Sequence, residues 1–130
     1  MVNKKLVPAN EFKAVTSIVA RYIEALRVGN VDMLSESFHK NSVTYGTVDG
    51  KLMGGDLNAT VDFINKHGKS SEIEAHVDVL DITPTSAVVR VVAEKDAVDS
   101  DSIEFLTLIK IDGRWAIFAT FNRLPLSIAQ

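Results

Sequence analysis

Residues 103–121 read IEFLTLIKIDGRWAIFATF and carry the clearest structural signal of the chain. Asp112-Gly113 divides them into two apolar runs, Ile103–Ile111 and Arg114–Phe121. An Asp-Gly pair tolerates the positive φ angles of a two-residue turn, so the two runs should pair as an antiparallel hairpin.

The expected hairpin is apolar on both of its faces. One face would carry Leu106, Leu108, Trp115, Ile117 and Phe121, and the other Phe105, Ile109, Ile111 and Phe118. Antiparallel strands with one face in water alternate apolar and polar residues, so a hairpin that is apolar on both sides needs two covers. We expect helices on one face and a second subunit on the other.

Helical periodicity dominates the first part of the chain. A candidate N-cap, Asn10, and a candidate stop, Gly29, enclose a run in which apolar residues recur at helical spacing. This stripe comprises Phe12, Val15, Ile18, Val19, Tyr22, Ile23 and Leu26. A second helix, over Val31–Phe38 with Asn30 as its cap, and a third that follows Asp56 are expected next.

Strand-like runs make up the remainder. Asp49-Gly50 marks a small hairpin, which Gly54-Gly55 would end by breaking the chain. Glu72–Thr83 and Ser86–Glu94 form two further runs before the hairpin of residues 103–121. Four consecutive antiparallel strands must bury a broad apolar face, and the preceding helices are the cover available.

We therefore predict a single α+β domain over residues 1–130, with its core at about 10–123. Its curved antiparallel sheet would form a cone around the long first helix, with two shorter helices beside it. Side chains need not fill the wide end of such a cone, so the fold tends to supply a pocket.

Composition limits the function classes. The chain has no cysteine, which excludes disulfides, thiol catalysis and cysteine-ligated zinc. The net charge is -3, and lysine and arginine are scattered singly, which argues against a nucleic-acid partner. No run approaches the roughly 20 apolar residues of a membrane span, and no signal peptide is recognisable. We expect a cytoplasmic protein without a membrane partner.

Two motifs resemble a known family. Phe38-His39 leads into Val43-Thr44-Tyr45-Gly46, and the closing hairpin holds a Leu-x-Leu-x-Lys-x-Asp-Gly-x-Trp run. With these residues the chain resembles the nuclear transport factor 2-like superfamily, a cystatin-like α+β cone, and within it the putative lumazine-binding proteins. The resemblance covers about residues 12–123. In that group Phe-His is usually followed by Pro-Asp, whereas here Lys40-Asn41 follows, which removes a carboxylate beside His39.

The resemblance implies a ligand cavity between sheet and helices, commonly in a homodimer. The superfamily includes ketosteroid isomerase, scytalone dehydratase and polyketide cyclases. Eight side chains are candidates for such a pocket: Tyr22, His39, Tyr45, Phe63, His76, Arg90, Glu104 and Phe118. His39 could act as a general base beside Tyr45, or it could cap the preceding helix or hydrogen-bond neighbouring backbone.

Charges within the strand-like runs leave alternatives open. Glu74, His76 and Asp78 alternate and project from one strand face, either as a proton-transfer group or as a solvated polar face. Arg90 and Glu104 stand in apolar surroundings, so they should be exposed, paired with each other, or aimed at a ligand. Three ligands on one flat strand converge poorly on an ion, and we expect no metal and no cofactor.

Three functions fit these patterns. The first is binding of a small apolar or aromatic molecule in the pocket of a homodimer that pairs through its sheet. The second is a cofactor-independent isomerase, dehydratase or cyclase that uses a histidine and a carboxylate for acid–base chemistry in the same pocket. The third is a dimerisation or docking module that uses the doubly apolar sheet.

Overall fold

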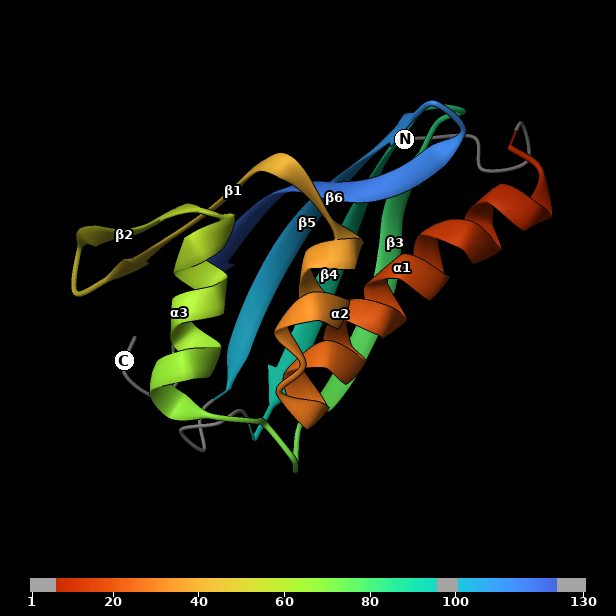
Figure 1. Cartoon of the computed structure of the whole chain (residues 1–130). Coiled ribbons are helices and arrows are strands. Elements are labelled where there is room, and N and C mark those ends of the chain that lie inside the picture. The colour runs from red at the N-terminus through yellow and green to blue at the C-terminus, as the bar shows by residue number, and fades with distance from the viewer. Residues whose placement is uncertain (1–6, 96–100, 124–130) are drawn as a thin grey trace.

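The computed structural model describes residues 7–95 and 101–123 (Figure 1). Its elements are α1 (Ala9–Val28), α2 (Val31–Ser37), β1 (Phe38–Val48), β2 (Lys51–Asp56), α3 (Leu57–His67), β3 (Glu74–Ile82), β4 (Ser86–Glu94), β5 (Ser102–Ile111) and β6 (Arg114–Arg123). This order of two helices, a hairpin, a helix and four strands confirms the α+β prediction. Among the described helices, none is long and apolar enough to cross a membrane.

The six strands form one curved sheet in the order β2-β1-β6-β5-β4-β3, with the helices on one side of it (Figure 1). Neighbouring strands are antiparallel except β1 and β6, which are parallel. The sheet is therefore mixed, whereas the sequence predicted an antiparallel sheet. Strands β3 to β6 form an antiparallel meander, and β1 lies beside β6, the last strand of that meander. Because β1 runs in the same direction as β6, this pair is parallel.

Helix ends follow the sequence signals with one exception. Gly29 adopts a left-handed conformation, with φ 71°, and ends α1. The side chains of Asn30 and Asp56 accept backbone N–H groups at the starts of α2 and α3. The prediction of Asn10 as a cap is wrong, because α1 begins at Ala9, with Pro8 in the capping position. The fixed φ of proline suits a helix start without any side-chain cap.

The two Asp-Gly pairs form the predicted hairpin turns. Asp112 and Gly113 have φ angles of 53° and 76°, as a turn of this twist requires. The prediction that Gly54-Gly55 breaks the chain is wrong, because both residues belong to β2. Gly54 pairs with Tyr45 of β1 and approaches its backbone so closely that a Cβ would collide there. Glycine thus extends the hairpin instead of ending it.

A β-bulge in β6 reverses part of the predicted face assignment. In the pairing of β5 with β6, Phe118 has no partner, so inward and outward positions exchange beyond it. Phe121 consequently lies opposite Phe105 on the face away from the helices, where the two are 51% and 42% exposed. The prediction that Phe121 shares the face of Leu106 is wrong for this reason.

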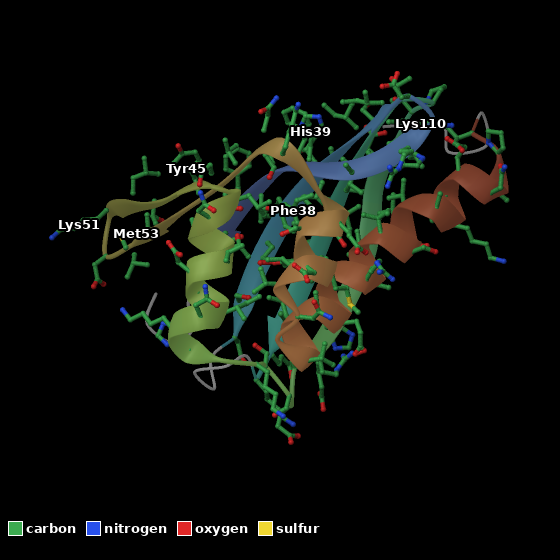
Figure 2. The ribbon with its side chains drawn as sticks, in the orientation of Figure 1. Phe38, His39, Tyr45, Lys51, Met53 and Lys110 are labelled. Carbon is green, nitrogen blue, oxygen red and sulfur yellow. The ribbon has the colours of Figure 1, made fainter. Side chains whose placement is uncertain are left out.

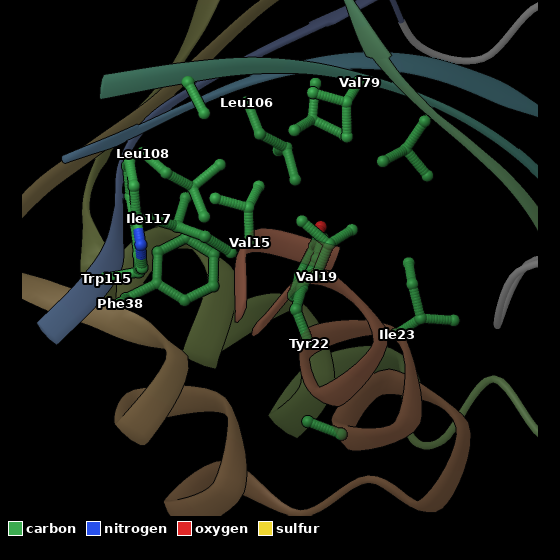
Figure 3. Packing of buried hydrophobic residues seen from close by; sticks show 14 of the residues in the cluster. Val15, Val19, Tyr22, Ile23, Phe38, Val79, Leu106, Leu108, Trp115 and Ile117 are labelled. Carbon is green, nitrogen blue, oxygen red and sulfur yellow. The ribbon is translucent and has the colours of Figure 1, made fainter. Parts of the chain in front are cut away.

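The core lies between α1 and the concave face of the sheet (Figure 3). Val15 and Val19 of α1 are fully buried, as are Leu106, Leu108 and Ile117 of the closing hairpin. These residues are members of the predicted helical stripe and of the predicted inner face of the hairpin. Their packing holds α1 across the sheet and leaves the region beyond its C-terminal half open for a cavity.

Candidate functional site

A cavity of about 370 Å³ lies between the sheet and the helices. Its walls come from the C-terminal half of α1, from β1, β2 and α3, and from the ends of β4, β5 and β6. Most of the lining atoms are apolar. Ligand sites of proteins are typically concave, largely apolar and of about 300–1,000 Å³, so this cavity has the size for a small molecule.

A buried tyrosine–glutamate pair forms part of the cavity wall. The hydroxyl of Tyr22 donates to both carboxylate oxygens of Glu104, at 2.7 and 3.0 Å. The two residues are 3% and 8% exposed, and both line the cavity. Tyr22 belongs to the buried stripe of α1, and Glu104 alternates with Leu106 on the inner face of β5. The pair thus joins the helix to the sheet with its polar atoms beside the cavity.

Burial sets the protonation of this tyrosine. Desolvation raises the pKa of Tyr22 well above its ordinary value, and the negative charge of Glu104 and the hydrogen bond raise it further. The hydroxyl therefore keeps its proton throughout the physiological pH range. It acts in the site as a hydrogen-bond donor, never as a phenolate.

Further polar groups lie around this pair. Asn122 of β6 stands directly opposite Glu104 of β5 in the strand register. Its Oδ1 atom is buried, and the described residues offer it no hydrogen-bond partner. Across the cavity, Thr60 and Thr44 join α3 to β1 through their hydroxyls, at 3.3 Å. The cavity thus combines an apolar lining with a few polar groups from α1, α3 and the strands β1, β5 and β6.

The charged side chains among the described residues that line the cavity are both carboxylates. Glu104 lies in the wall and Asp62 is exposed on α3, and the described residues that line the cavity include no lysine, arginine or histidine. Nor do the described residues contain a cluster of three His, Cys, Asp or Glu that could hold a metal ion. The described lining residues offer the chemistry of two carboxylates, a phenol hydroxyl, an amide and aliphatic hydroxyls.

Three of the eight candidate residues line the cavity, namely Tyr22, Phe63 and Glu104. The others lie elsewhere: His39, Tyr45, His76, Arg90 and Phe118. The ring of His39 stacks on Phe118 at a centroid distance of 4.7 Å, and its Nδ1 accepts the backbone N–H of Asn41 at 3.0 Å. Hydrogen bonding to neighbouring backbone was one of the two alternatives for His39. Figure 2 shows His39 on the opposite side of β1 from Phe38.

His76 of β3 and Arg90 of β4 lie on the face of the sheet away from the helices. His76 is exposed between Glu74 and Asp78, as expected of a solvated polar face. Arg90 stands opposite Asp78, whereas Glu104 stands opposite Val91 on the inner face. Of the three alternatives for these charges, pairing of Arg90 with Glu104 is wrong, because neighbouring positions along β4 project to opposite sides of the sheet. Arg90 is exposed, and Glu104 lines the cavity.

Asn122 is a polar cavity residue whose inward direction the sequence pattern does not reveal. Strict alternation from Trp115 along β6 places it on the outer face. The bulge at Phe118 turns it inward, and no residue type announces that bulge. The inward direction of Glu104 does have a signal, which is its alternation with Leu106 and Leu108.

Comparisons with known proteins agree with this architecture. A family model described as "Putative lumazine-binding" matches residues 10–121. The protein named aldolase FrzH, from Cladobotryum sp, is 35% identical over 122 residues, which cover 93% of this chain and 98% of that protein. An NTF2-like protein of unknown function from Methylobacillus flagellatus KT superimposes with a TM-score of 0.84 at 26% identity, over 90% of this chain and 94% of that one. Another, from Shewanella baltica OS155, has a TM-score of 0.82 at 23% identity, over 88% and 94%.

Proposed function

We propose that this chain, which belongs to the putative lumazine-binding family within the nuclear transport factor 2-like superfamily, binds a small molecule in the cavity between its sheet and its helices. One observation carries the proposal: an apolar cavity of about 370 Å³ that has a buried, hydrogen-bonded Tyr22–Glu104 pair in its wall. Apolar walls give affinity, and a few fixed polar groups orient the ligand. The ligand is accordingly a small apolar or aromatic molecule with a polar group.

The test is to identify a compound that stays with the protein through purification. Native mass spectrometry of the wild type should show an additional bound mass. Ala59 lines the cavity, so Ala59→Phe should displace this mass by filling the space. Ala20→Phe is the matched control, because Ala20 is exposed on α1 and does not line the cavity. Retention of the same compound by Ala59→Phe would place the ligand elsewhere and refute the proposal.

A second candidate function is proton transfer at carbon, favoured by the buried carboxylate and by the relative that is named an aldolase. Glu104 would remove a proton beside a ligand carbonyl. The hydroxyl of Tyr22 would then break its hydrogen bond to the newly protonated Glu104 and donate its single proton to the enolate oxygen. In an aldol reaction the enolate carbon then bonds to a second carbonyl carbon. The alkoxide formed there takes the proton back from Glu104. This balance requires no cofactor, and no histidine among the described residues takes part because none lines the cavity.

Hydrogen–deuterium exchange tests this candidate without knowledge of the natural substrate. Exchange at the α-carbon of phenylacetaldehyde in D₂O can be followed by proton NMR. The wild type should accelerate exchange over buffer, and Glu104→Gln should abolish the acceleration. His39→Gln is the control, because His39 lies outside the cavity and should leave the rate unchanged. Full acceleration by Glu104→Gln would refute a role of this carboxylate as the base.

We also propose that the chain forms a homodimer through the sheet face away from the helices. Phe105 and Phe121 stand opposite each other on this face, and both are exposed. Large aromatic side chains are usually buried, so an exposed pair of this kind indicates an interaction surface. Sedimentation velocity at low micromolar concentration should show a dimer, and Phe105→Glu should convert it to a monomer. Val28→Glu is the control, because Val28 is also apolar and exposed but lies at the end of α1, on the side of the sheet that carries the helices. A wild-type monomer would refute the proposal.

A further inference from the structure

We infer that the ligand of the cavity carries a neutral carbonyl oxygen, to which the hydroxyls of Ser70 and Ser102 donate. This inference rests on the proposed small-molecule function and specifies the chemical class of the ligand. It follows from the burial of the two serines, from the hydrogen bonds that their side chains lack, and from the backbone contacts that hold both residues at one end of the cavity.

Two buried hydroxyls in the cavity wall have no partner among the described residues. Ser70 and Ser102 are 3% and 5% exposed, and both line the cavity. Neither side chain makes a hydrogen bond to a described residue, whereas the hydroxyls of Tyr22 and of the Thr44–Thr60 pair are engaged. Buried hydroxyls of folded proteins are normally hydrogen-bonded, because an unmade bond in a dry site costs free energy. These two hydroxyls are therefore free to bind a ligand.

Backbone contacts hold the two serines at the same end of the cavity. The backbone N–H of Ser70 donates to the carbonyl of Leu26 at 2.8 Å, and its own carbonyl accepts from the N–H of Ile73 at 2.9 Å. Ser102 stands directly opposite Ala93 in the register of β4 and β5. Leu26, Ile73 and Ala93 also line the cavity. The serines therefore border the cavity where β4 ends and where β3 and β5 begin (Figure 1).

The number of protons at these serines favours a carbonyl oxygen in the ligand. Each serine hydroxyl carries one proton that needs an acceptor, and a carbonyl oxygen has two lone pairs and no proton of its own. A ligand that only donates would leave both serine protons without an acceptor. An alcohol brings a further donor, which must leave water and find its own partner. A hydrocarbon would satisfy neither serine.

The rest of the wall selects an apolar body and a neutral polar group. Ile23, Leu26 and Phe63 line the cavity with aliphatic and aromatic surface. Two hydrogen bonds from neutral hydroxyls return far less free energy than an ionised group loses when it leaves water. The serines therefore suit a ketone, an aldehyde or an ester better than a carboxylate. The complementary ligand is an apolar carbonyl compound.

Three probes that share one ring system test the inference: the ketone 1-indanone, the alcohol 1-indanol and the hydrocarbon indane. Binding to the intact protein is measured by equilibrium dialysis at pH 7. A carbonyl group prefers water to apolar surroundings, so without a donor in the wall indane would bind more tightly than 1-indanone. With both serines as donors, 1-indanone should bind at least about tenfold more tightly than indane. The affinity of 1-indanol should lie between the two.

Variants assign the preference to the two serines. Ser70→Ala and Ser102→Ala each remove one donor, and each should weaken the binding of 1-indanone by about fivefold without weakening that of indane. The double variant should lose the preference for 1-indanone. Because neither hydroxyl has a described partner, both single variants should melt no lower than the wild type in the absence of a probe. Ser35→Ala is the control, because Ser35 is exposed on α2 outside the cavity and should change none of the affinities.

The outcomes separate this inference from the proposed function. Equal affinities for 1-indanone and indane, both abolished by Ala59→Phe, would overturn the carbonyl assignment and leave small-molecule binding in the cavity intact. A preference for 1-indanone that survives in the double variant would overturn it as well, and so would tighter binding of 1-indanol than of 1-indanone. A markedly lower melting temperature of either single variant would show that its hydroxyl already has a structural partner, which would also overturn the assignment. Failure of all three probes to bind, or binding that Ala59→Phe does not affect, would count against the proposed function and this inference together.

Discussion

Replacing Tyr22 with Phe removes one hydroxyl from a buried site and leaves the ring in place. The hydroxyl donates to the two oxygens of Glu104 at 2.7 and 3.0 Å, which amounts to one shared hydrogen bond because a hydroxyl carries a single proton. A hydrogen bond to a charged group contributes about 1.5–3 kcal/mol, and burial of both partners removes competition from water. We therefore expect Tyr22→Phe to lower the free energy of unfolding by about 2 kcal/mol.

The same substitution should cost less when Glu104 is replaced by Gln. The amide oxygen of Gln can still accept from Tyr22, but a hydrogen bond between neutral groups contributes only about 1 kcal/mol. The double-mutant cycle should therefore give a coupling of about 1 kcal/mol. The cycle isolates this pair whatever else the side chain of Glu104 contacts.

Urea unfolding of the four proteins, at pH 7 and one fixed protein concentration, measures the coupling. Melting temperatures provide a check, since a domain of this length loses about 4 °C per kcal/mol. Tyr22→Phe should then melt about 8 °C below the wild type. A coupling within about 0.3 kcal/mol of zero, which is the usual error of additivity, would refute a charged partner for Tyr22.

Three further predictions concern pH and backbone. Burial raises the pKa of Tyr22, so the unfolded chain releases this proton near pH 10 while the folded chain keeps it. The free energy of unfolding, measured in urea, should therefore fall as the pH rises above about 10. It should fall less steeply in Tyr22→Phe, which lacks this proton. The hydrogen bond and the charge of Lys110 lower the pKa of Glu11. The ionised carboxylate therefore contributes to the free energy of unfolding above about pH 4.3, and this contribution is lost as the pH falls below that value. Glu11→Gln should accordingly lose less stability in acid than the wild type, as followed by circular dichroism. Gly54 and Gly55 both have positive φ, but only at Gly54 would a Cβ collide with the backbone of β1. Gly54→Ala should therefore lower the free energy of unfolding by at least about 1 kcal/mol more than Gly55→Ala. Equal losses would contradict the close approach of β2 to β1 at Gly54.

Much of this fold follows from local sequence signals. The caps at Asn30 and Asp56 and the turn at Asp112-Gly113 predict element boundaries because each signal acts through its own backbone. The apolar stripe of α1 likewise predicts which face of this helix packs on the sheet, because helical periodicity is a local property of the sequence. The parallel pairing of β1 with β6 has no local signal, since it depends on how distant segments pack.

The cavity was predictable as a feature of the cone but only partly in its residues. Tyr22 and Glu104 follow from periodicity, although their contact joins segments far apart in the chain. The acid–base chemistry of histidine made His39 and His76 candidate site residues, yet both lie away from the cavity. Residue type indicates what a side chain can do, whereas strand register and bulges decide where it points, as Asn122 shows.

The parallel contact between β1 and β6 also bears on how the chain folds. The strands β3 to β6 are joined in sequence as a meander, so each can pair with a neighbour that is close along the chain. By contrast, β1 pairs locally only with β2, and its other edge pairs with the distant β6, where Phe38 lies opposite Ile117. Contacts of such large sequence separation close long loops and slow folding. Since β1, β5 and β6 all contribute to the cavity, we expect the ligand site to form in the late stage of folding, after the meander. A ligand present during folding would then stabilise the last step and not the first.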